Sequence, residues 1–176
     1  EDVPFEFVDN VMDVISKTPQ HTYQLLTKRA ERMAEYFSSR LIPQNVWLGV
    51  TIEDTLTKYR IDFLRNLSAQ VKFLSCEPLL CDLGELDLEG VDWIIVGGES
   101  GPIARPMKEE WVLNIKRQAE QKSIPFFFKQ WGTWSKEGVK GNKKKNGKLL
   151  QGEVIQQMPK VVHENFRNKD QTKFWK

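Results

Sequence analysis

The chain has 176 residues, 40% of them hydrophobic, which is enough for one hydrophobic core and one domain but not for two. Its two cysteines and two histidines are too few for a disulfide framework, and they argue against a zinc site. No apolar run approaches the roughly 18 to 20 residues of a membrane span, and no signal peptide is visible. We therefore expect reduced thiols and an intracellular, cytoplasmic protein with no membrane partner.

The net charge of +2 is unevenly distributed along the chain. Residues 136–176 contain 11 Lys or Arg and 4 Asp or Glu, a net charge of +7, whereas the other 135 residues contain 15 and 20, a net charge of −5. A basic C-terminal segment on an acidic body favours a polyanion as partner. The alternative is a solvated tail without a partner, because runs of charge are usually just soluble.

The first predicted element is a helix near the start of the chain, for which Asp2 is a candidate cap. Thr18-Pro19-Gln20 ends this helix. Because Glu1 is not a methionine and a helix opens almost at once, we expect a further N-terminal part in the parent protein. The apolar positions that keep helical spacing are Phe5, Val8, Met12 and Ile15.

Strands and helices then alternate. Near-continuous apolar runs such as WIIV and PFFF are typical of strands that are buried on both faces. Residues 79–90 form a connection, with room for a short strand or turn. The expected strands are His21–Thr27, Val46–Ile52, Val71–Cys76, Val91–Val96 and Ile124–Lys129. The expected helices between them are Ala30–Ser39, Asp54–Leu67 and Lys108–Lys122.

Five strands with helical crossovers indicate a parallel sheet covered by helices, and they are too few for a closed eight-stranded barrel, which needs about 200 residues or more. We predict an α/β fold of mainly parallel β/α units. Residues 1–134 would form a partial TIM-barrel-like domain, with an open sheet as the alternative. Residues 135–176 would form an irregular, basic, Gly- and Lys-rich segment and tail, with a hairpin turn at Asn146-Gly147.

Polar residues follow every predicted strand. In parallel α/β folds the C-terminal strand ends form the ligand-binding face, so these side chains should converge on one rim. Three carboxylates would there meet two lysines and an arginine. Each feature also has a plain alternative: a strand stop at Glu77-Pro78, a helix-start acid at Glu53, and a solvated helix start at Lys28-Arg29. The polar strand ends are Thr27-Lys28-Arg29, Thr51 with Glu53, Ser75-Cys76-Glu77, Gly97-Gly98-Glu99-Ser100 and Lys129-Gln130-Trp131.

The sequence from Gly97 to Gly101 is the sharpest local motif. Glycines after a buried strand let backbone N–H groups approach a ligand and form an anion-binding concavity. The alternative is a tight turn that needs positive φ, because the motif lacks the spacing of a dinucleotide fingerprint or a phosphate loop. Downstream, the Arg105 guanidinium is placed to reach a carboxylate or phosphate on the same rim.

Trp131 and Trp134 lie beyond the last predicted strand and could form a stacking wall for a planar ligand or a base. The alternative is a hydrophobic cap over the mouth of the barrel. Cys76 and Cys81 are interpreted as packing residues, because a nucleophilic cysteine needs a histidine partner and neither histidine is placed to serve.

Five ordered segments carry a family resemblance that runs from about Glu1 to Pro159. They are TPQHTYQLLTKRAERM, NVWLGVTIED, VKFLSCEPLL, VDWIIVGGESGPIARPM and PFFFKQWGTW. Together they resemble the bacteriophage Gp37/Gp68 family, a domain of unknown function. The resemblance implies a barrel of the radical S-adenosylmethionine type, with S-adenosylmethionine and an iron–sulfur (4Fe–4S) cluster as cofactors of the full-length parent.

Family members usually carry a three-cysteine cluster motif before the region that corresponds to Glu1, and this sequence lacks it. The resemblance therefore covers the C-terminal portion of the family domain and implies no metal ligand in this chain, Cys76 and Cys81 included. An enzymatic activity is expected only when the cluster-binding part is present, and no residue is predicted to be catalytic. The substrate would be a nucleic acid or nucleotide, and a partner protein is a further expectation.

The resemblance also implies site residues. Glu99 and Ser100 would bond the cofactor's amino or ribose groups, and Lys28, Arg29 and Arg105 would bind carboxylate or phosphate. The implied cofactor-binding set is Gly97, Gly98, Glu99, Ser100, Glu77 and Ser75. The implied substrate-binding set is Thr27, Lys28, Arg29, Glu53, Arg105, Lys129, Gln130 and Trp131.

Two further hypotheses stand beside this one. The first is a non-catalytic nucleic-acid-binding module that uses the basic tail, Lys143-Lys144-Lys145, Trp131 and Trp134; it predicts salt-sensitive binding. The second is a decayed phage fragment with no function, which would show as a chain that does not fold alone and whose unpaired strand edges are prone to aggregation.

Overall fold

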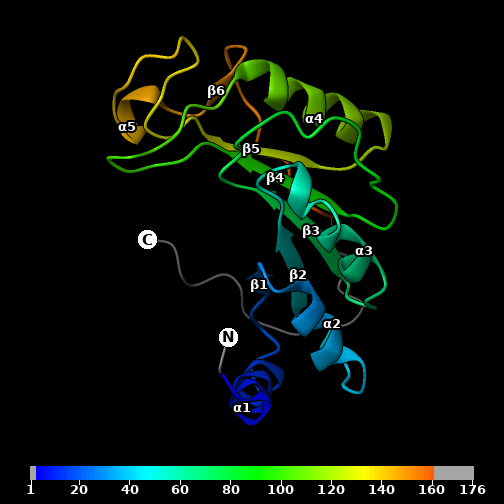
Figure 1. Ribbon diagram of the computed structural model, residues 1–176. Coiled ribbons are helices and arrows are strands. Elements are labelled where there is room, and N and C mark those ends of the chain that lie inside the picture. Colours follow the sequence, from blue (N-terminus) through cyan, green and yellow to red (C-terminus); the bar gives the residue numbers. More distant parts are fainter. Residues whose placement is uncertain (1–2, 161–176) are drawn as a thin grey trace, which may run out of the picture.

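The computed structural model describes residues 3–160 and has a five-stranded, all-parallel sheet at its centre (Figure 1). The strands lie side by side in the order of the sequence. Each strand boundary falls within two residues of its prediction, which confirms the mainly parallel β/α fold class. The strands are β1 (Tyr23–Thr27), β2 (Val46–Thr51), β3 (Val71–Cys76), β4 (Trp93–Gly97) and β5 (Phe126–Gln130).

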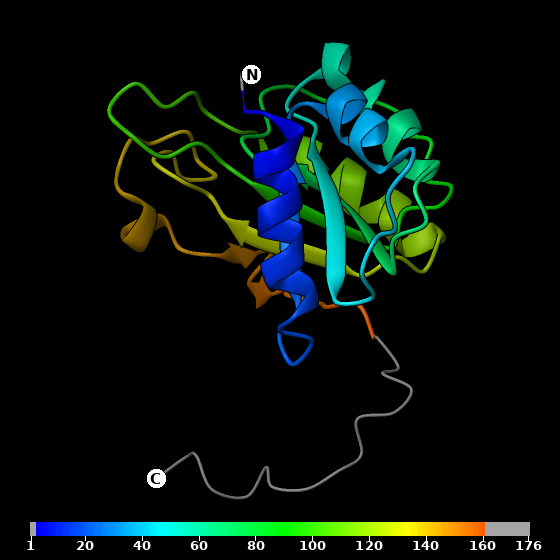
Figure 2. The ribbon, with the colours of Figure 1, turned by 90° about the horizontal axis from the view of Figure 1, so that it is seen from below.

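The three crossover helices α2, α3 and α4 lie on the same side of the strands (Figure 2), and α1 packs on the same core beside β1. This follows from the strand order, because crossovers between neighbouring parallel strands are nearly always right-handed and so return over the same face. The helices are α1 (Phe5–Ser16), α2 (Ala30–Phe37), α3 (Arg60–Arg65) and α4 (Glu109–Gln121).

One prediction about a helix start was wrong, and another concerns a residue outside the described part of the chain. The continuous helix expected from Asp54 is instead a 3₁₀ turn, η1 (Thr55–Thr57), followed by α3. Asp54 accepts a bond from the Thr57 N–H (3.1 Å) while the Thr57 hydroxyl accepts one from the Asp54 N–H (3.2 Å), and this capping box closes a separate short turn. Pro4 stands at the N-cap of α1, and Asp2 lies outside the described residues.

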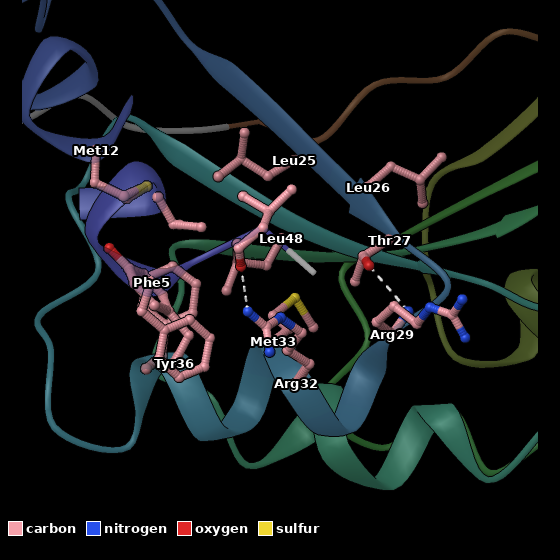
Figure 3. A pocket seen from close by; sticks show the side chains of 13 residues that line it. Phe5, Met12, Leu25, Leu26, Thr27, Arg29, Arg32, Met33, Tyr36 and Leu48 are labelled. Carbon is pink, nitrogen blue, oxygen red and sulfur yellow. Dashed lines mark hydrogen bonds between the residues drawn. The ribbon is translucent and has the colours of Figure 1, made fainter. Parts of the chain in front are cut away.

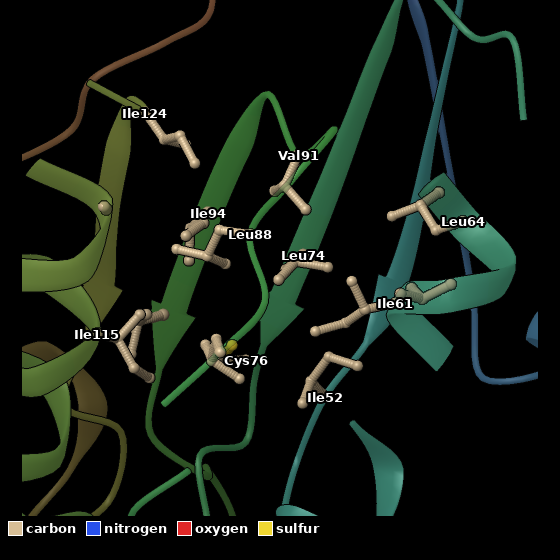
Figure 4. Close-up of a cluster of buried hydrophobic side chains, with 14 of the residues drawn as sticks. Ile52, Ile61, Leu64, Leu74, Cys76, Leu88, Val91, Ile94, Ile115 and Ile124 are labelled. Carbon is tan, nitrogen blue, oxygen red and sulfur yellow. The ribbon is translucent and has the colours of Figure 1, made fainter. Parts of the chain in front are cut away.

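The main core lies between the sheet and its helices (Figure 4). Leu48, Leu74 and Ile94 point from three neighbouring strands into this core and are completely buried. Ile61 of α3 and Ile115 of α4 pack against them from the helix layer. Burial of this apolar surface is the main source of the fold's stability.

No helix lies between β3 and β4. The connection there covers the sheet with buried leucines instead. Its backbone is bonded to α4, because the Gln118 side chain accepts from the Leu86 N–H (2.8 Å) and donates to the Gly84 carbonyl (2.9 Å). Residues 79–90 therefore form the predicted connection, which contains turns and neither a strand nor a helix. The leucines, each at most 9% exposed, are Leu79, Leu83, Leu86 and Leu88.

Aromatic side chains cover the other face of the sheet. Trp47 and Trp93 meet edge to face with ring centroids 5.9 Å apart, and Phe73 lies 5.6 Å from Trp93. Gly49 makes room for this cluster, because a Cβ there would lie 2.3 Å from the Phe73 ring. The middle strands are thus buried on both faces, as their apolar runs predict.

The C-terminal segment packs on the main core through Leu150 and Ile155. It contains the short helix α5 (Lys143–Asn146) and a hairpin of β6 (Leu149–Leu150) and β7 (Glu153–Val154). The hairpin turn lies at Gln151-Gly152, where both residues have positive φ (51° and 87°), and the prediction of a turn at Asn146-Gly147 was wrong.

Residues 155–157 then bond to the free edge of β5, where the Phe128 N–H donates to the Ile155 carbonyl (2.7 Å). His163 and the tail predicted over 161–176 lie outside the described residues. No helix within residues 3–160 is long and apolar enough to cross a membrane.

Candidate functional site

The C-terminal ends of the five strands bring charged side chains together at one edge of the sheet. Parallel strands all end at the same edge, and the register sets which residues become neighbours: Thr51 of β2 lies opposite Ser75 of β3. Both of these side chains are buried. The strand-end rim, as we use the term, consists of Lys28, Glu53, Arg60, Glu77, Glu99, Arg105, Lys129 and Gln130.

Glu53 is the most buried carboxylate of the rim. Its Oε1 accepts a bond from Lys28, which follows β1, and its Oε2 accepts one from the Arg60 guanidinium at 2.7 Å. The same Arg60 nitrogen also bonds the Thr51 carbonyl (2.7 Å). The Glu53 and Arg60 side chains are only 11% and 12% exposed, so this is a largely buried ion pair.

Arg60 is the rim residue that sequence reasoning missed. It opens α3, seven positions after Glu53, within what was expected to be one continuous amphipathic helix. A charged residue near a helix start is usually solvated, so nothing in the pattern marked it. The one signal in the sequence was the spacing between Glu53 and Arg60. Arg60 follows Glu53 by seven positions, close enough to pair with it, and a strand-end carboxylate needs a cation if it is buried.

Glu77 is paired with the end of β5. Its Oε2 accepts from Lys129 Nζ (2.8 Å), and its Oε1 accepts from Gln130 Nε2 (2.5 Å). Gly97 of the intervening strand leaves room for this pairing, because a Cβ there would lie 3.2 Å from the Glu77 carboxyl carbon. The predicted meeting of strand-end carboxylates and cations therefore occurs across β3, β4 and β5.

Glu99 forms a bidentate pair with Arg105. The guanidinium donates to both carboxylate oxygens at 2.9 Å, and the Arg105 backbone N–H donates to one of them at 2.8 Å. The Arg105 side chain, then its backbone N–H, lowers the pKa of Glu99 to about 2, and the charge of Lys28 acts in the same direction. Lys28 therefore acts electrostatically on two carboxylates of the rim.

The Glu99–Arg105 pair predicts an unusual titration. Because the folded pKa lies below the ordinary value of 4.5, the stability from this pair is complete above that value and is lost as the pH falls through about 2. A carbon-detected NMR titration of the Glu99 carboxyl should give a midpoint near 2. In an Arg105→Gln variant the midpoint should return toward 4.5, whereas an ordinary midpoint in the unaltered chain would contradict the pair.

The glycine motif after β4 packs against the chain that follows β5. A Cβ on Gly98 would lie 2.0 Å from the Trp131 carbonyl oxygen, so only glycine fits there. The Gly98 N–H donates to the Gln130 carbonyl (2.9 Å), and the Gly101 N–H donates to the Thr133 hydroxyl (2.9 Å). The anion-binding concavity expected here thus has two of its N–H groups already bonded within the chain.

Some predicted site residues do not join the rim. Trp131 is 2% exposed, packs against Phe128 with ring centroids 5.0 Å apart, and donates its indole N–H to the Leu149 carbonyl (2.8 Å). Trp131 is therefore a residue of the core and forms no stacking wall. Trp134 is half-buried and donates to the Ala104 carbonyl (2.6 Å), while Ser100 is exposed at the loop surface.

A separate apolar cavity of about 280 Å³ lies between α1, β1 and α2 (Figure 3). Thr27 and Arg29, which were predicted to bind substrate, line this cavity rather than the rim, and the Thr27 hydroxyl accepts the Arg29 N–H (2.9 Å). Arg32 spans the cavity wall and donates to the Val3 carbonyl (2.5 Å). Most of its lining residues are apolar, so the chemistry of this cavity differs from that of the rim.

The cysteines do not suit an iron–sulfur cluster, which is held by three or four thiolates. Cys76 is completely buried; burial first, and the charge of Glu53 second, raises the pKa of its thiol to about 12. Cys81 is partly exposed. Within residues 3–160 no three His, Cys, Asp or Glu side chains are grouped so that they could hold a metal ion.

The two thiols should differ in reactivity, because only the thiolate is nucleophilic. With iodoacetamide at about pH 8, the native chain should be modified at Cys81 alone, and unfolding in guanidinium should expose Cys76 as well. Mass spectrometry of the labelled peptides measures this. Labelling of native Cys76 at the rate of Cys81 would contradict its burial.

Comparison with known proteins identifies the family. Residues 1–159 match the family described as protein of unknown function (DUF5131), so the chain belongs to that family. The match covers the same region as the resemblance carried by the five sequence segments. Neither a search of curated proteins nor a search of solved structures found a match to the chain.

Proposed function

We propose that this member of the DUF5131 family binds S-adenosylmethionine at its strand-end rim, beside a substrate held at the same edge of the sheet. The observation that carries the proposal is the set of three rim carboxylates, each paired with a cation from a neighbouring strand end or loop. Radical chemistry would need a cluster for which residues 3–160 offer no ligand set, so the proposal concerns binding.

The alternating charges of the rim suit a zwitterion. An amino acid group presents an ammonium and a carboxylate a few ångströms apart. When it binds at a carboxylate–cation pair, its ammonium can pair with the protein's carboxylate and its carboxylate with the protein's cation, so that no charge is left unpaired. In this proposal Glu99 accepts from the ammonium of S-adenosylmethionine and Arg105 donates to its carboxylate. The Glu99–Arg105 pair suits this exchange because its arginine is 60% exposed.

The remaining pairs would hold the rest of the site in place. The bonds from Lys129 and Gln130 to Glu77 connect the ends of β3 and β5 across β4. Lys28 donates to Glu53, and its charge also lowers the pKa of Glu99. The buried Glu53–Arg60 pair fixes the floor of the rim. Substrate phosphates or carboxylates would be attracted by Lys28 and Lys129, which are about half exposed.

The sheet would form part of a larger barrel of the radical S-adenosylmethionine type. Two features support this. Within the described residues, β1 pairs with β2 alone and so leaves its other edge without a strand partner. In addition, α1 carries a second apolar stripe that packs on nothing described, with Phe7 59%, Val11 40% and Val14 58% exposed. This edge and stripe form the surface on which a further β/α unit would pack.

The test is calorimetric titration of the chain with S-adenosylmethionine. Glu99→Gln should weaken binding about tenfold or more, because the ligand's ammonium would no longer meet a charged acceptor. A matched control is Lys116→Gln, which removes a charge from an α4 surface pair. 5′-Methylthioadenosine, which lacks the amino acid group, should bind more weakly than S-adenosylmethionine. Absence of binding, or equal binding by the Glu99→Gln and unaltered chains, would overturn the proposal.

A further inference from the structure

A second polar site lies in the C-terminal segment, apart from the pairs of the rim. It is a hollow of about 450 Å³, within the range of small-ligand pockets. We call it the lysine-lined hollow; its lining includes Lys136, Glu137, Val139, Lys140, Lys145 and Leu149.

The lysines around this hollow outnumber its carboxylates, whereas each cation of the rim pairs with a carboxylate. Residues 136–148 contain six lysines and one acidic residue, Glu137, a net charge of +5. In the described part of the chain, the only ion pair of this segment joins Lys136 to Glu137, at a long 3.8 Å. The unneutralised charge on one short segment makes a site for an anion with several charges.

The segment is anchored, so its lysines occupy a defined surface. Asn146 donates to the Gly132 carbonyl (3.0 Å), and the Gly141 N–H donates to the Thr133 carbonyl (2.8 Å). The completely buried Leu150 ties the following hairpin to the main core. Such anchoring lowers the entropic cost of binding, compared with a loose charged tail.

Apolar side chains form part of the wall of the hollow. Val139 is 63% exposed and Leu149 is 52% exposed, although both lie among lysines. An apolar surface beside an excess of lysines matches a ligand that has a flat apolar part and a negative charge next to it. A nucleotide has this composition, and its base is accessible for such an interaction when the strand is unpaired.

We infer that the lysine-lined hollow binds single-stranded nucleic acid, with a base against Val139 and Leu149 and phosphates near Lys136 and Lys145. The hollow adjoins the loop that carries Glu99 and Arg105, because Lys140 Nζ donates to the Pro102 carbonyl (2.8 Å). A strand bound in the hollow would also be the substrate of the rim, and only this second statement rests on the proposed function. Strand binding by the hollow stands independently.

The experiment is fluorescence anisotropy of a labelled, mixed-sequence single-stranded DNA with the full chain, over a range of salt concentrations. The variant Lys136→Gln/Lys145→Gln should bind about tenfold more weakly, with a salt slope flatter by about 0.7 for each phosphate that no longer meets a lysine. Val139→Ser should weaken binding several-fold with an unchanged slope. The matched control, Lys17→Gln/Lys116→Gln, lowers the net charge equally and should bind like the unaltered chain.

Three results would overturn the inference. The control pair could weaken binding as much as the hollow pair, which would indicate a general effect of net charge. A duplex of the same length could bind as tightly as the strand. An acidic peptide of equal charge could compete as well as the unlabelled strand. S-adenosylmethionine titration of the Lys136→Gln/Lys145→Gln variant separates the two proposals, because rim binding should be unchanged there whichever way the DNA result falls.

Discussion

Gly98→Ala should destabilise the chain by about 3 kcal/mol or more in free energy of unfolding, as large steric effects in a packed interior do. The added Cβ would lie 2.0 Å from the Trp131 carbonyl oxygen and 2.8 Å from its carbonyl carbon. These are backbone atoms, so no rotation of a side chain relieves the clash. The two loops at the end of β4 and β5 would have to separate. Urea denaturation followed by circular dichroism measures the change.

Gly97→Ala is the matched control for this prediction. Its Cβ would meet the Glu77 side chain at 3.2 Å, which the side chain can relieve by a small rotation. We expect a cost of about 1 kcal/mol or less, together with a weakened Glu77–Lys129 pair. Equal effects of the two neighbouring substitutions would contradict the close backbone approach between Gly98 and Trp131.

Arg60→Leu should cost about 3 kcal/mol, because removing one partner of a buried ion pair leaves the other charge buried without full compensation. Glu53 would then keep only Lys28, which is 57% exposed and reaches it from the solvent side. The bond from Arg60 to the Thr51 carbonyl would also disappear. Thermal and urea unfolding both measure the effect.

The comparison for Arg60 is Lys129→Met, which breaks a rim pair whose lysine is 47% exposed. Exposed pairs contribute about 0 to 1 kcal/mol, so this variant should be close to the unaltered chain in stability. A second check is Glu53→Gln combined with Arg60→Leu, which removes both charges and should cost less than the sum of the two single substitutions. Equal costs for Arg60→Leu and Lys129→Met would contradict the buried pair.

The fold could be predicted in large part because the strands are buried on both faces. The runs Val46–Val50 of β2 and Trp93–Val96 of β4 contain only apolar residues and one glycine, and such runs are typical of strands in a parallel sheet. The hairpin turn was misplaced because Asn146-Gly147 has a stronger local turn pattern than Gln151-Gly152. Local preference was overridden there by α5 and by the burial of Leu150 in the distant core.

The sequence predicted most of the residues that lie at the rim, but not which of them pair with one another. Strand ends converge in any parallel sheet, so the positions of Glu53, Glu77 and Glu99 followed from the strand pattern. Their partners depend on tertiary structure: Arg60 comes from a helix, and Lys129 reaches past an intervening strand. Trp131 turned inward because the Leu149 carbonyl accepts its indole N–H, a bond to a residue 18 positions away that no local pattern indicates.

Binding of S-adenosylmethionine at the strand-end rim can be followed residue by residue. The most direct measurement is a nitrogen-15 NMR titration of the labelled chain with this compound. We expect amide shifts confined to the strand ends, around Lys28, Glu53, Glu77, Glu99 and Lys129. Shifts confined to the apolar cavity between α1, β1 and α2, or no shifts at saturating ligand, would contradict this expectation.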